Sequence, residues 1–269
     1  MQTNATIKTD PKSVQSGEIA PEAKDELEQR VQERTAQLES RNRELQEFAF
    51  AASHDLNEPL RKIRVFSKLV LARKKEQMDE ECRDYLTRME AAANRMQNLL
   101  DALLSYSRVT THGREFVPVE LNRVIGDAEA DLELAIRSSG GRLETSSLPT
   151  VKGDPEQLRQ LFQNLIANAV KYRRNGIAPL VRIRGEGNGR FHSIYVEDNG
   201  IGMEEKYLEK IFLPFQRLHG RTEYEGTGMG LAICRRIVER HQGGIRATSK
   251  PGEGSAFIVT LPAADQAGC

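Results

Sequence analysis

An apolar heptad pattern between Lys24 and Ser107 is the feature that most constrains the fold of this chain. In its second half, apolar side chains recur at alternating spacings of four and three residues, which predicts one amphipathic helix. These residues are Tyr85, Met89, Ala92, Met96, Leu99, Leu103 and Tyr106. A polar stretch near Lys74–Glu80 precedes this helix, so we expect it to pair with the first helix as an antiparallel hairpin.

A hairpin of two amphipathic helices cannot bury both of its apolar rows by itself. Two copies of the chain would bury them by forming a four-helix bundle. Because most soluble oligomers are symmetric homo-oligomers, we predict a homodimer. The start of the first helix would be weak as an isolated coiled coil, since Arg34 and Arg41 occupy positions that favour apolar residues.

The apolar row of the first helix changes phase around a histidine. From Leu45 onward its residues are Leu45, Phe48, Ala52, Leu56, Pro59, Ile63, Phe66 and Val70. Two consecutive spacings of four form a stutter, which locally unwinds a supercoil and here brackets His54. His54 lies about 200° around the helix from both Ala52 and Leu56, and Pro59 collides with the carbonyl of Asp55. We therefore expect His54 to be exposed at a kinked turn, beside the carboxylate of Asp55.

The residues after Ser107 alternate between helix and strand patterns, which predicts an α+β sandwich with helices on one face of a sheet. The expected helices are 121–137, 155–172 and 228–241, and the expected strands are 117–119, 181–186, 191–198, 245–249 and 256–261. Asp154 and Pro155 supply an N-cap and a first-turn proline for the second of these helices. The expected domains are a disordered tail at 1–23, an input helix and hairpin at 24–108, a linker at 109–116, a second domain at 117–262 and a tail at 263–269.

Composition narrows the partners and the compartment. Lys plus Arg and Asp plus Glu are 39 each, so the zero net charge gives no reason to expect nucleic acid or an anionic membrane as a partner. No stretch approaches the roughly 18 apolar residues of a membrane span, and the N-terminus has no apolar signal core. Cys82, Cys234 and Cys269 share no metal-ligand spacing, so we expect free thiols. These features predict a cytoplasmic protein.

Three segments in the second half of the chain suit a nucleotide. In the first, Asn164, Asn168, Lys171 and Tyr172 fall on one side of the helix expected at 155–172. An amide oxygen is a neutral ligand that suits a Mg²⁺ ion still largely coordinated by water and phosphate. Taken alone, these residues are more simply explained as the polar face of a helix.

The second segment follows the strand expected at 191–198. At the end of this strand, Asp198 can accept a hydrogen bond from an exocyclic amino group such as that of adenine. Gly200 and Gly202 allow the backbone to pass close to a flat base. The same string of residues also suits an ordinary turn.

The third segment, Gly226, Thr227, Gly228 and Gly230, opens a helix. Glycines and the N–H groups at a helix N-terminus form a phosphate cradle. The segment lacks the Gly-Lys-Ser/Thr ending of a P-loop, so that fold is excluded. Each segment alone is a weak signal, whereas all three in this order are a specific one.

Residues 25–262 resemble the catalytic core of a sensor histidine kinase. The run from Ser53 to Arg61 resembles the phosphoacceptor box, particularly the version in phytochrome-like kinases. The three segments resemble the N box and the two glycine boxes of that family. Ile211–Arg217 resembles its F box, and Gly252–Ser255 resembles its last turn before the final strand.

The resemblance implies a fold, an activity and partners. The fold is an antiparallel helical hairpin that forms a dimeric four-helix bundle, followed by an α/β-sandwich ATP-binding domain of the histidine kinase, Hsp90 and gyrase type. The activity is that of an ATP-dependent protein histidine kinase, a transferase of two-component phosphorelay signalling that uses Mg²⁺. The implied partners are the receiver domain of a response regulator and a separate or upstream sensor domain.

The resemblance also implies residue roles. His54 would be the phosphoacceptor and Asp55 the general base beside it. In the ATP-binding domain, Asn168 would bind Mg²⁺ with Asn164 nearby, Lys171 would contact phosphate, Tyr172 would pack near the base, and Asp198 would bind the adenine amino group. The glycine boxes, with Gly200, Gly202, Gly226, Thr227, Gly228 and Gly230, would shape the pocket and a mobile lid between Gly202 and Gly226. Arg217 in this lid would contact phosphate.

One position departs from many members of the family. The fourth residue after His54 is Glu58, where many relatives carry Thr or Asn, and this position shares a helix face with His54. In the family a hydroxyl or amide there helps to place water for dephosphorylation of the regulator. A carboxylate would repel phosphoryl groups, so we expect weak phosphatase activity. The simpler alternative is that Glu58 is a solvated helix residue.

Two other functions remain as alternatives. The first is an ATPase of the same superfold, which places a water-activating Glu four residues before the metal-binding Asn. Here that residue is Asn164, which cannot act as a general base. The second is a coiled-coil scaffold with a degenerate kinase domain, against which the intact Asn168, Asp198 and glycines argue.

Overall fold

The computed structural model describes residues 21–74, 78–111, 113–218, 220, 224 and 226–264 of the 269-residue chain. It divides into two units, residues 1–48 and 49–269. The first unit is described from Pro21 onward as the N-terminal part of helix α1 (Pro21–Lys74). The predicted tail at 1–23 therefore lies mostly outside the described residues.

The second unit begins with a helical hairpin, which consists of the rest of α1 and of α2 (Glu80–Thr111). Asn57 Oδ1 accepts a hydrogen bond from Gln97 Nε2 at 2.6 Å, and Lys68 Nζ lies 3.5 Å from the carboxylate of Glu90. Residue numbers rise along α1 as they fall along α2, so the two helices are antiparallel, as predicted.

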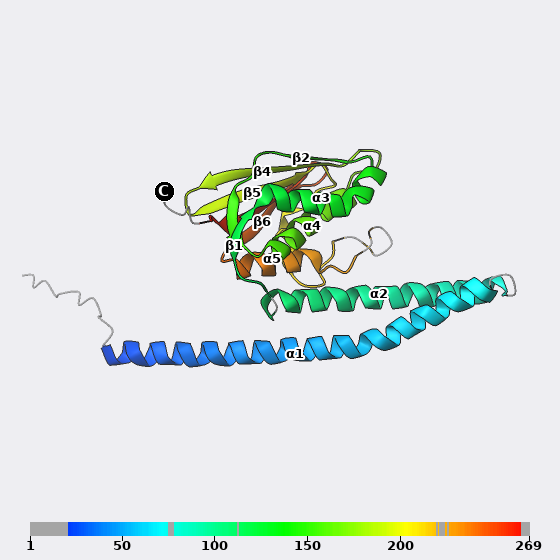
Figure 1. The fold of residues 1–269 in the computed structure, drawn as a ribbon, viewed down its shortest axis with the longest axis horizontal. Coiled ribbons are helices and arrows are strands. Elements are labelled where there is room, and N and C mark those ends of the chain that lie inside the picture. The colour runs from blue at the N-terminus through cyan, green and yellow to red at the C-terminus, as the bar shows by residue number, and fades with distance from the viewer. Residues whose placement is uncertain are drawn as a thin grey trace, which may run out of the picture. The chain divides into compact units, whose positions relative to one another are not determined.

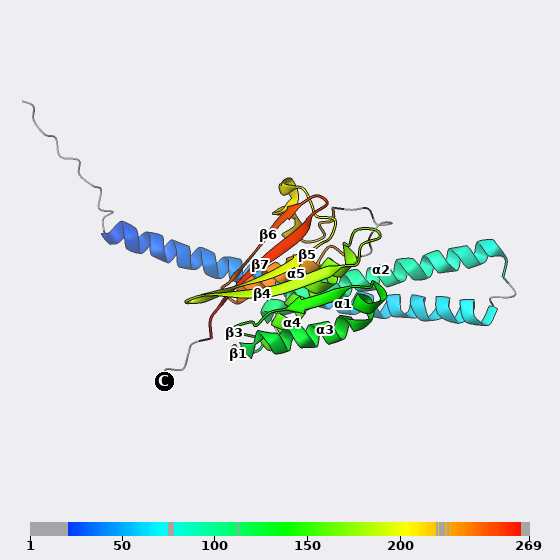
Figure 2. The ribbon, with the colours of Figure 1, turned by 90° about the horizontal axis from the view of Figure 1, so that it is seen from above.

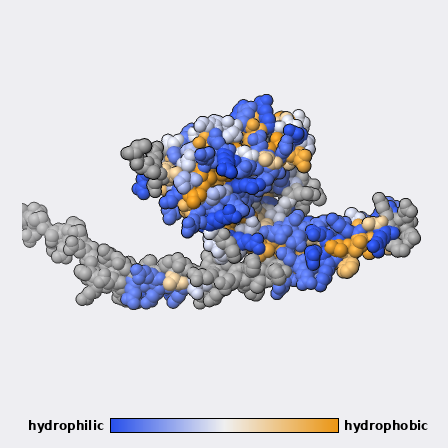
Figure 3. Space-filling view, in the orientation of Figure 1, coloured by the Kyte–Doolittle hydropathy of each residue, from blue (hydrophilic) through white to orange (hydrophobic). Residues whose placement is uncertain are grey.

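Much of the apolar row on each helix of the hairpin is exposed. The space-filling view shows apolar surface over the hairpin (Figure 3). The exposed members of the two rows are Leu56, Ile63, Phe66, Val70, Tyr85, Met89, Met96 and Leu99. The described hairpin thus leaves uncovered the surface for which the sequence predicts a second copy of the chain.

The rest of the second unit is built on a mixed five-stranded sheet. Its strands are β2 (Arg142–Thr145), β4 (Leu180–Asn188), β5 (Phe191–Asp198), β6 (Gly244–Lys250) and β7 (Gly254–Pro262). They lie in the order β2-β4-β5-β7-β6, with β2 parallel to β4 and the other pairs antiparallel. Strand β5 is therefore the central strand of the sheet, and Asp198 at its end pairs with Val181 of β4 and Ser255 of β7.

Three helices cover one face of this sheet (Figures 1 and 2). They are α3 (Leu121–Ser138), α4 (Pro155–Lys171) and α5 (Gly230–Arg240). Apolar side chains between the two layers form one core, because helix positions at spacings of three and four meet alternate strand positions. Its fully buried members include Leu121, Ile125, Leu158, Leu161, Phe162, Leu165, Ile166, Ile183, Ile194, Ile237 and Leu261. The predicted α/β sandwich is confirmed.

Two short strands were not predicted. Strand β3 (Thr150–Gly153) pairs with β1 (Val117–Glu120) as a separate two-stranded ribbon, and β2 extends the parallel edge of the main sheet. Each is four residues long, and β2 has no buried residue. Strands this short carry too few apolar residues for a period-two pattern to be recognised.

The segment between β5 and α5 contains two further elements that the sequence pattern did not indicate. They are 3-10 turns at η1 (Glu205–Tyr207) and η2 (Lys210–Phe212). Ile211 and Phe212 are buried, and the ring of Phe212 lies edge-on to Phe257 with 6.4 Å between centroids. This part of the predicted lid is therefore anchored in the core.

The expectations about membrane spans and thiols can be compared with the described residues. None of the described helices combines the length and apolar character needed to cross a membrane. Cys82 and Cys234 are free thiols, exposed and buried respectively. Cys269 lies outside the described residues.

The core predicts a clear difference between two leucines on helices. Leu165 on α4 is fully buried, whereas Leu134 on α3 is 83% exposed. We expect Leu165→Ala to lower the free energy of unfolding by about 2–5 kcal/mol, because it leaves a cavity. The control Leu134→Ala should change it by less than about 0.5 kcal/mol. Urea denaturation followed by circular dichroism measures both, and equal effects would contradict this description of the core.

Candidate functional site

The three segments singled out in the sequence converge at one end of the α/β domain. A pocket of about 70 Å³ is bounded by the C-terminal end of α4, the end of β5, the chain after η2 and the start of α5. Its lining includes Asn168, Tyr172, Asp198, Gly202 and Arg217, all of which were predicted as site residues. Met203, Leu218, Leu231 and Phe257 supply apolar walls.

Asp198 is the acidic group of this pocket. Its Oδ1 accepts hydrogen bonds from the backbone N–H of Gly200 at 2.8 Å and of Ser255 at 3.3 Å. Burial raises the pKa of Asp198 to about 6, and the two backbone N–H groups oppose that rise. Within the described residues both bonds go to Oδ1, so Oδ2 is left to accept a hydrogen bond from a ligand.

The turn after β5 holds Asp198 in place through close backbone contacts. Gly202 has a φ of 65°, and a Cβ there would lie 1.9 Å from the carbonyl oxygen of Lys250. Only glycine fits such a left-handed position against another strand. Gly202, which we expected to allow the close approach of a base, is thus required by the fold itself.

Asn199 is a structural residue of the site whose role the sequence analysis missed. Its Oδ1 accepts from the backbone N–H of Leu180 at 2.9 Å, and its Nδ2 donates to the carbonyl of Ala178 at 3.0 Å. Arg174 Nε donates to the Asn199 carbonyl at 2.8 Å. These bonds tie the loop after α4 to the end of β5. The signal was present, because Asn199 lies between Asp198 and Gly200 in the second segment.

Lys171 and Tyr172 connect the end of α4 to the third segment. Lys171 Nζ lies 3.0 Å from the Tyr172 hydroxyl, and a Cβ at Gly226 would lie 2.8 Å from the same Nζ. The rings of Tyr172 and Tyr224 are 4.9 Å apart. The ammonium group therefore lies against the loop that precedes α5, where an anion held by that loop would meet it.

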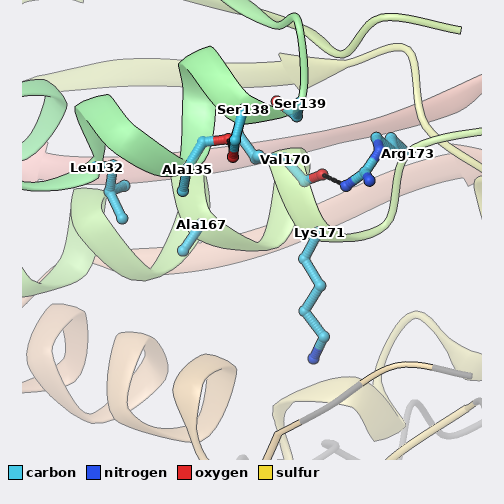
Figure 4. Close-up of a pocket in the computed structure, with 8 residues that line it drawn as sticks. All are labelled: Leu132, Ala135, Ser138, Ser139, Ala167, Val170, Lys171 and Arg173. Atoms are coloured by element: carbon cyan, nitrogen blue, oxygen red, sulfur yellow. Dashed lines mark hydrogen bonds between the residues drawn. The ribbon is translucent and has the colours of Figure 1, made fainter. Parts of the chain in front are cut away.

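A second cavity of about 260 Å³ lies between the ends of α3 and α4, and Lys171 is part of its wall. Its lining consists of Leu132, Ala135, Ser138, Ser139, Ala167, Val170, Lys171 and Arg173. The Lys171 side chain extends away from the serines and Arg173 (Figure 4). Its charge is thus directed out of this cavity, and the two sites are separate.

Arg217 braces the loop between η2 and α5. Its guanidinium donates to the carbonyl oxygens of Gly226 at 2.6 Å and Gly220 at 3.4 Å, and also to that of Tyr224. Gly228 follows in a left-handed conformation with a φ of 75°, and Thr227 Oγ1 accepts from the backbone N–H of Met229 at 3.3 Å. The predicted contact of Arg217 with phosphate stays a prediction.

Asn164 is half-buried like Asn168 and faces α5. A Cβ at Gly230 would lie 3.6 Å from Asn164 Oδ1, and Asn164 Nδ2 is buried with no hydrogen-bond acceptor among the described residues. Burial raises the pKa of the neighbouring Cys234 thiol, and the Asn164 amide opposes this rise. Asn164 therefore belongs to the packing between α4 and α5, beneath the start of the glycine segment.

The residues of the site fit only one kind of metal ion. The described residues contain no cluster of three or more His, Cys, Asp or Glu side chains that could enclose a cation. Asn168 lines the pocket and offers one neutral oxygen. Such a donor suits a Mg²⁺ ion that keeps most of its water and phosphate ligands, and it does not suit a zinc or calcium site made by the protein alone.

His54, the predicted phosphoacceptor, lies on the hairpin. His54 is within α1, but its side chain lies outside the described part of the structure, so its exposure stays a prediction. Asp55 and Glu58 are exposed, and Glu58 Oε1 lies 2.7 Å from Lys62 Nζ. Since Asn57 pairs with Gln97 in an antiparallel hairpin, His54 lies level with about residue 100 of α2.

Two family models match the chain in tandem. The phospho-acceptor domain of histidine kinases, His Kinase A, matches residues 44–112, and the histidine kinase-, DNA gyrase B- and HSP90-like ATPase domain matches residues 153–265. His54 lies in the first match, and the whole lining of the Asp198 pocket lies in the second.

Individual proteins are similar to the chain over both domains. The phytochrome-like protein Cph1 of Synechocystis sp. is 42% identical over 225 residues, which are 84% of this chain and 30% of that protein. The full-length structure of ShkA superposes on 80% of this chain and 45% of its own with a TM-score of 0.63 and 24% identity. The structure of ThkA with the response regulator TrrA covers 87% of this chain and 67% of its own, with a TM-score of 0.57 and 23% identity.

These matches define the class of protein: the chain belongs to the histidine kinases. Within that family its sequence is similar to the phytochrome-like kinases, as the phosphoacceptor run from Ser53 to Arg61 predicted. The chain spans about 30% of the length of Cph1.

The buried carboxylate predicts an unusual dependence of stability on pH. Since the pKa of Asp198 in the folded state is about 6, above the ordinary value of 3.8, folding is favoured when this group is protonated. Protonated Asp198 therefore contributes fully to the free energy of unfolding below about pH 4, and this contribution is lost as the pH rises to about 6. Asp198→Asn should remove this dependence and raise the free energy of unfolding near neutral pH by up to about 3 kcal/mol.

Urea denaturation at a series of pH values tests this expectation without nucleotide. An asparagine at 198 still offers Oδ1 to the two backbone N–H groups, so the loop should persist. The exposed Asp127 provides a control, and Asp127→Asn should leave the pH profile unchanged. A less stable Asp198→Asn variant near neutral pH would show that burial of this carboxylate is not costly.

Proposed function

We propose that the chain is an ATP-dependent protein histidine kinase that autophosphorylates His54 and transfers the phosphoryl group to an aspartate in the receiver domain of a response regulator. The observation that carries the proposal is the meeting of Asn168, Asp198 and Gly202 at one pocket, with Gly226 beside Lys171 at the end of the same helix, in a chain whose hairpin matches a phospho-acceptor domain.

The base of the nucleotide would occupy the Asp198 pocket. Oδ2 of Asp198 would accept a hydrogen bond from the adenine amino group, and Tyr172 and the apolar wall would pack on the ring. An ionised carboxylate accepts this bond more strongly than a protonated carboxyl, and its pKa of about 6 leaves Asp198 mostly ionised at neutral pH. The structure of ShkA in complex with AMPPNP, which has the same fold, supports the choice of an adenine nucleotide.

The phosphates would lie between the end of α4 and the start of α5. The backbone N–H groups at the N-terminus of α5 and the ammonium of Lys171 supply positive charge there. Asn168 would hold a Mg²⁺ ion through its amide oxygen, and this ion would neutralise charge on the β- and γ-phosphates. Arg217 would reach phosphate after releasing one of its loop carbonyls.

The reaction is a displacement at the γ-phosphorus. A nitrogen of the neutral imidazole of His54 forms the new N–P bond, the bond to the bridging oxygen of ADP breaks, and Asp55 accepts the proton of the other ring nitrogen. The same imidazole then leaves when a receiver aspartate attacks the phosphoryl group. Positioning and electrostatic stabilisation supply most of the rate enhancement.

The pocket of about 70 Å³ is smaller than the roughly 300–1,000 Å³ of typical ligand sites, so the chain around it must move to admit a nucleotide. Ile211 and Phe212 are buried in the core, which restricts this movement to the chain between Phe212 and Gly226. The lid predicted from Gly202 to Gly226 would thus move mainly in its second half, and its mobility stays a prediction.

The exposed apolar rows of the hairpin support a homodimer. Eight apolar side chains along these rows are exposed in one copy, and a four-helix bundle would bury them. We propose the hairpin, 24–108, as the dimerisation and phosphoacceptor domain, 109–116 as the linker and 117–262 as the ATP-binding domain. ThkA in complex with the response regulator TrrA supports a receiver domain as partner, and a separate or upstream sensor domain would supply the signal.

The packing of Asn164 argues against the rival ATPase. A water-activating group at this position must be a base, whereas Asn164 is a half-buried amide that lies against Gly230 and Cys234. Phosphoryl transfer to water would therefore lack its general base, and transfer to His54 is favoured.

Labelling with γ-labelled ATP distinguishes the candidate functions. We expect a label on the protein that is acid-labile and base-stable, and we expect it to be lost in His54→Gln because the nucleophile is gone. Asp198→Asn should also lose most of it, through weaker ATP binding. Free phosphate without protein label would support the ATPase, and neither product would support the scaffold.

Glu58 predicts a kinase with weak phosphatase activity. Its carboxylate lies one helix turn from His54 and would repel a phosphoryl group. Addition of the unphosphorylated kinase to a phosphorylated receiver domain should therefore accelerate its decay by less than about twofold. A clear acceleration that Glu58→Ala abolishes would refute the prediction, and Lys62→Ala controls for loss of the Glu58–Lys62 ion pair.

A further inference from the structure

The linker between the hairpin and the ATP-binding domain is held by a polar cluster that takes no part in the proposed chemistry. We call the four residues Asp154, Gln157, Arg240 and His241 the linker clamp. The first two lie at the start of α4, and the other two lie at the end of α5. All four contact or support the chain between Val109 and Phe116.

Arg240 is the centre of the linker clamp. Its NH1 group donates to Gln157 Oε1 at 2.9 Å and to Asp154 Oδ2 at 3.3 Å, and its NH2 group donates to the Arg114 carbonyl at 2.8 Å. Its guanidinium lies over the ring of Phe116, 4.6 Å from the centroid. Asp154 Oδ2 accepts from the backbone N–H of Arg114 at 2.7 Å. One guanidinium thus joins both helices to the linker.

Buried groups beneath Arg240 fix its position. Asp154 is 1% exposed and His241 is fully buried. His241 Nε2 accepts from the backbone N–H of Asp154 at 2.9 Å, so its Nδ1 carries the proton and donates to the Ile237 carbonyl at 2.7 Å. The imidazole stacks on Phe116 with 4.4 Å between centroids. Burial lowers the pKa of His241, which keeps the ring neutral and this arrangement intact at neutral pH.

A second set of contacts joins α2 to the same two helices. Gln157 Nε2 donates to the Val109 carbonyl at 2.8 Å, and Gln160 Nε2 donates to Ser105 Oγ at 2.7 Å. The buried side chain of Val109 is part of the core of the α/β domain. The last two turns of α2 are therefore packed on the ATP-binding domain.

These contacts define the direction in which the domain faces. Along α4, residues 157 and 160 contact residues 109 and 105 of α2, so α4 runs toward lower residue numbers of α2. Along α5, Arg240 contacts the linker and Arg236 lies 5.8 Å from the ring of Tyr106, so its N-terminus points the same way. The phosphate-binding ends of both helices thus point toward the level of residue 100, which lies opposite His54.

We propose that Arg240 is a positioning residue of phosphoryl transfer, which locks the linker so that the nucleotide end of the ATP-binding domain faces the level of His54. This inference rests on the proposed kinase function. Arg240 does not line the nucleotide pocket, and its described contacts go to the linker and the start of α4, so it acts through the linker. A buried ion pair with Asp154 is a costly way to stabilise a fold, which favours a role in setting this geometry.

The test separates catalysis from nucleotide binding in the 269-residue chain. Arg240→Met removes the guanidinium and keeps an apolar stem. We expect kcat for His54 labelling at saturating ATP to fall at least about tenfold, because misplacement of the donor is costly. The Kd for ATP, measured by calorimetry, should change by less than about twofold. Arg240→Lys should recover only part of kcat, because an ammonium cannot reproduce the forked contacts.

Two further variants control the interpretation. Arg235 lies on the same helix, is half exposed and pairs with Glu239. The substitution Arg235→Gln should therefore leave kcat and Kd unchanged. Gly113→Ala changes only the linker, since a Cβ there would lie 2.1 Å from Arg240 Cζ and would displace the guanidinium. It should reproduce the fall in kcat, and the double variant with Arg240→Met should fall no further.

The outcomes separate this inference from the proposed function. If the wild-type protein is labelled and the kcat of Arg240→Met stays within about twofold of the wild-type value, the positioning role alone is overturned. A parallel loss of kcat and ATP affinity would also overturn it, because it would indicate a purely structural role. Absence of label in the wild-type chain, with ATP still bound, would overturn the kinase function and this inference with it.

Discussion

The structure of the α/β domain depends on the burial of helix α4 against the sheet. Leu158, Leu161 and Leu165 on one side of α4 are fully buried, which fixes the rotation of the helix about its axis. Its polar side must then face α5 and the pocket, where Asn168 lies near Asp198. At its N-terminus, Asp154 caps the helix and binds Arg240. One buried helix therefore aligns the nucleotide pocket at one end with the linker contacts at the other.

Much of this arrangement could be predicted from the sequence, because a long periodic pattern determines whether a segment is a helix or a strand and which of its sides is buried. The heptads predicted the hairpin, and the strand before Asp198 was placed with the same limits that the structure shows, 191–198. The short strands β2 and β3 and the two 3-10 turns carry no such period and were missed. The candidate pocket was predicted through its polar and glycine positions, whereas its apolar walls depend on tertiary packing.

The contacts that the sequence could not predict are mostly side-chain to backbone bonds between distant segments. Asn199 binds the loop at Ala178 and Leu180, and Arg240 binds the carbonyl of Arg114 across 126 positions. Such bonds follow no periodic pattern in the sequence, and the type of either residue does not indicate its partner. They nevertheless help to determine where the pocket lies relative to the hairpin, which carries the proposed phosphoacceptor, His54.

In the proposed reaction, the γ-phosphoryl group of ATP becomes bonded to the imidazole of His54. Phosphorus NMR of the 269-residue chain after incubation with ATP and Mg²⁺ tests this bond directly. We expect a phosphoramidate resonance from the protein that disappears on acidification, persists in base and is absent from His54→Gln. ADP and inorganic phosphate as the only new phosphorus species, or a phosphoramidate that persists in His54→Gln, would contradict this assignment.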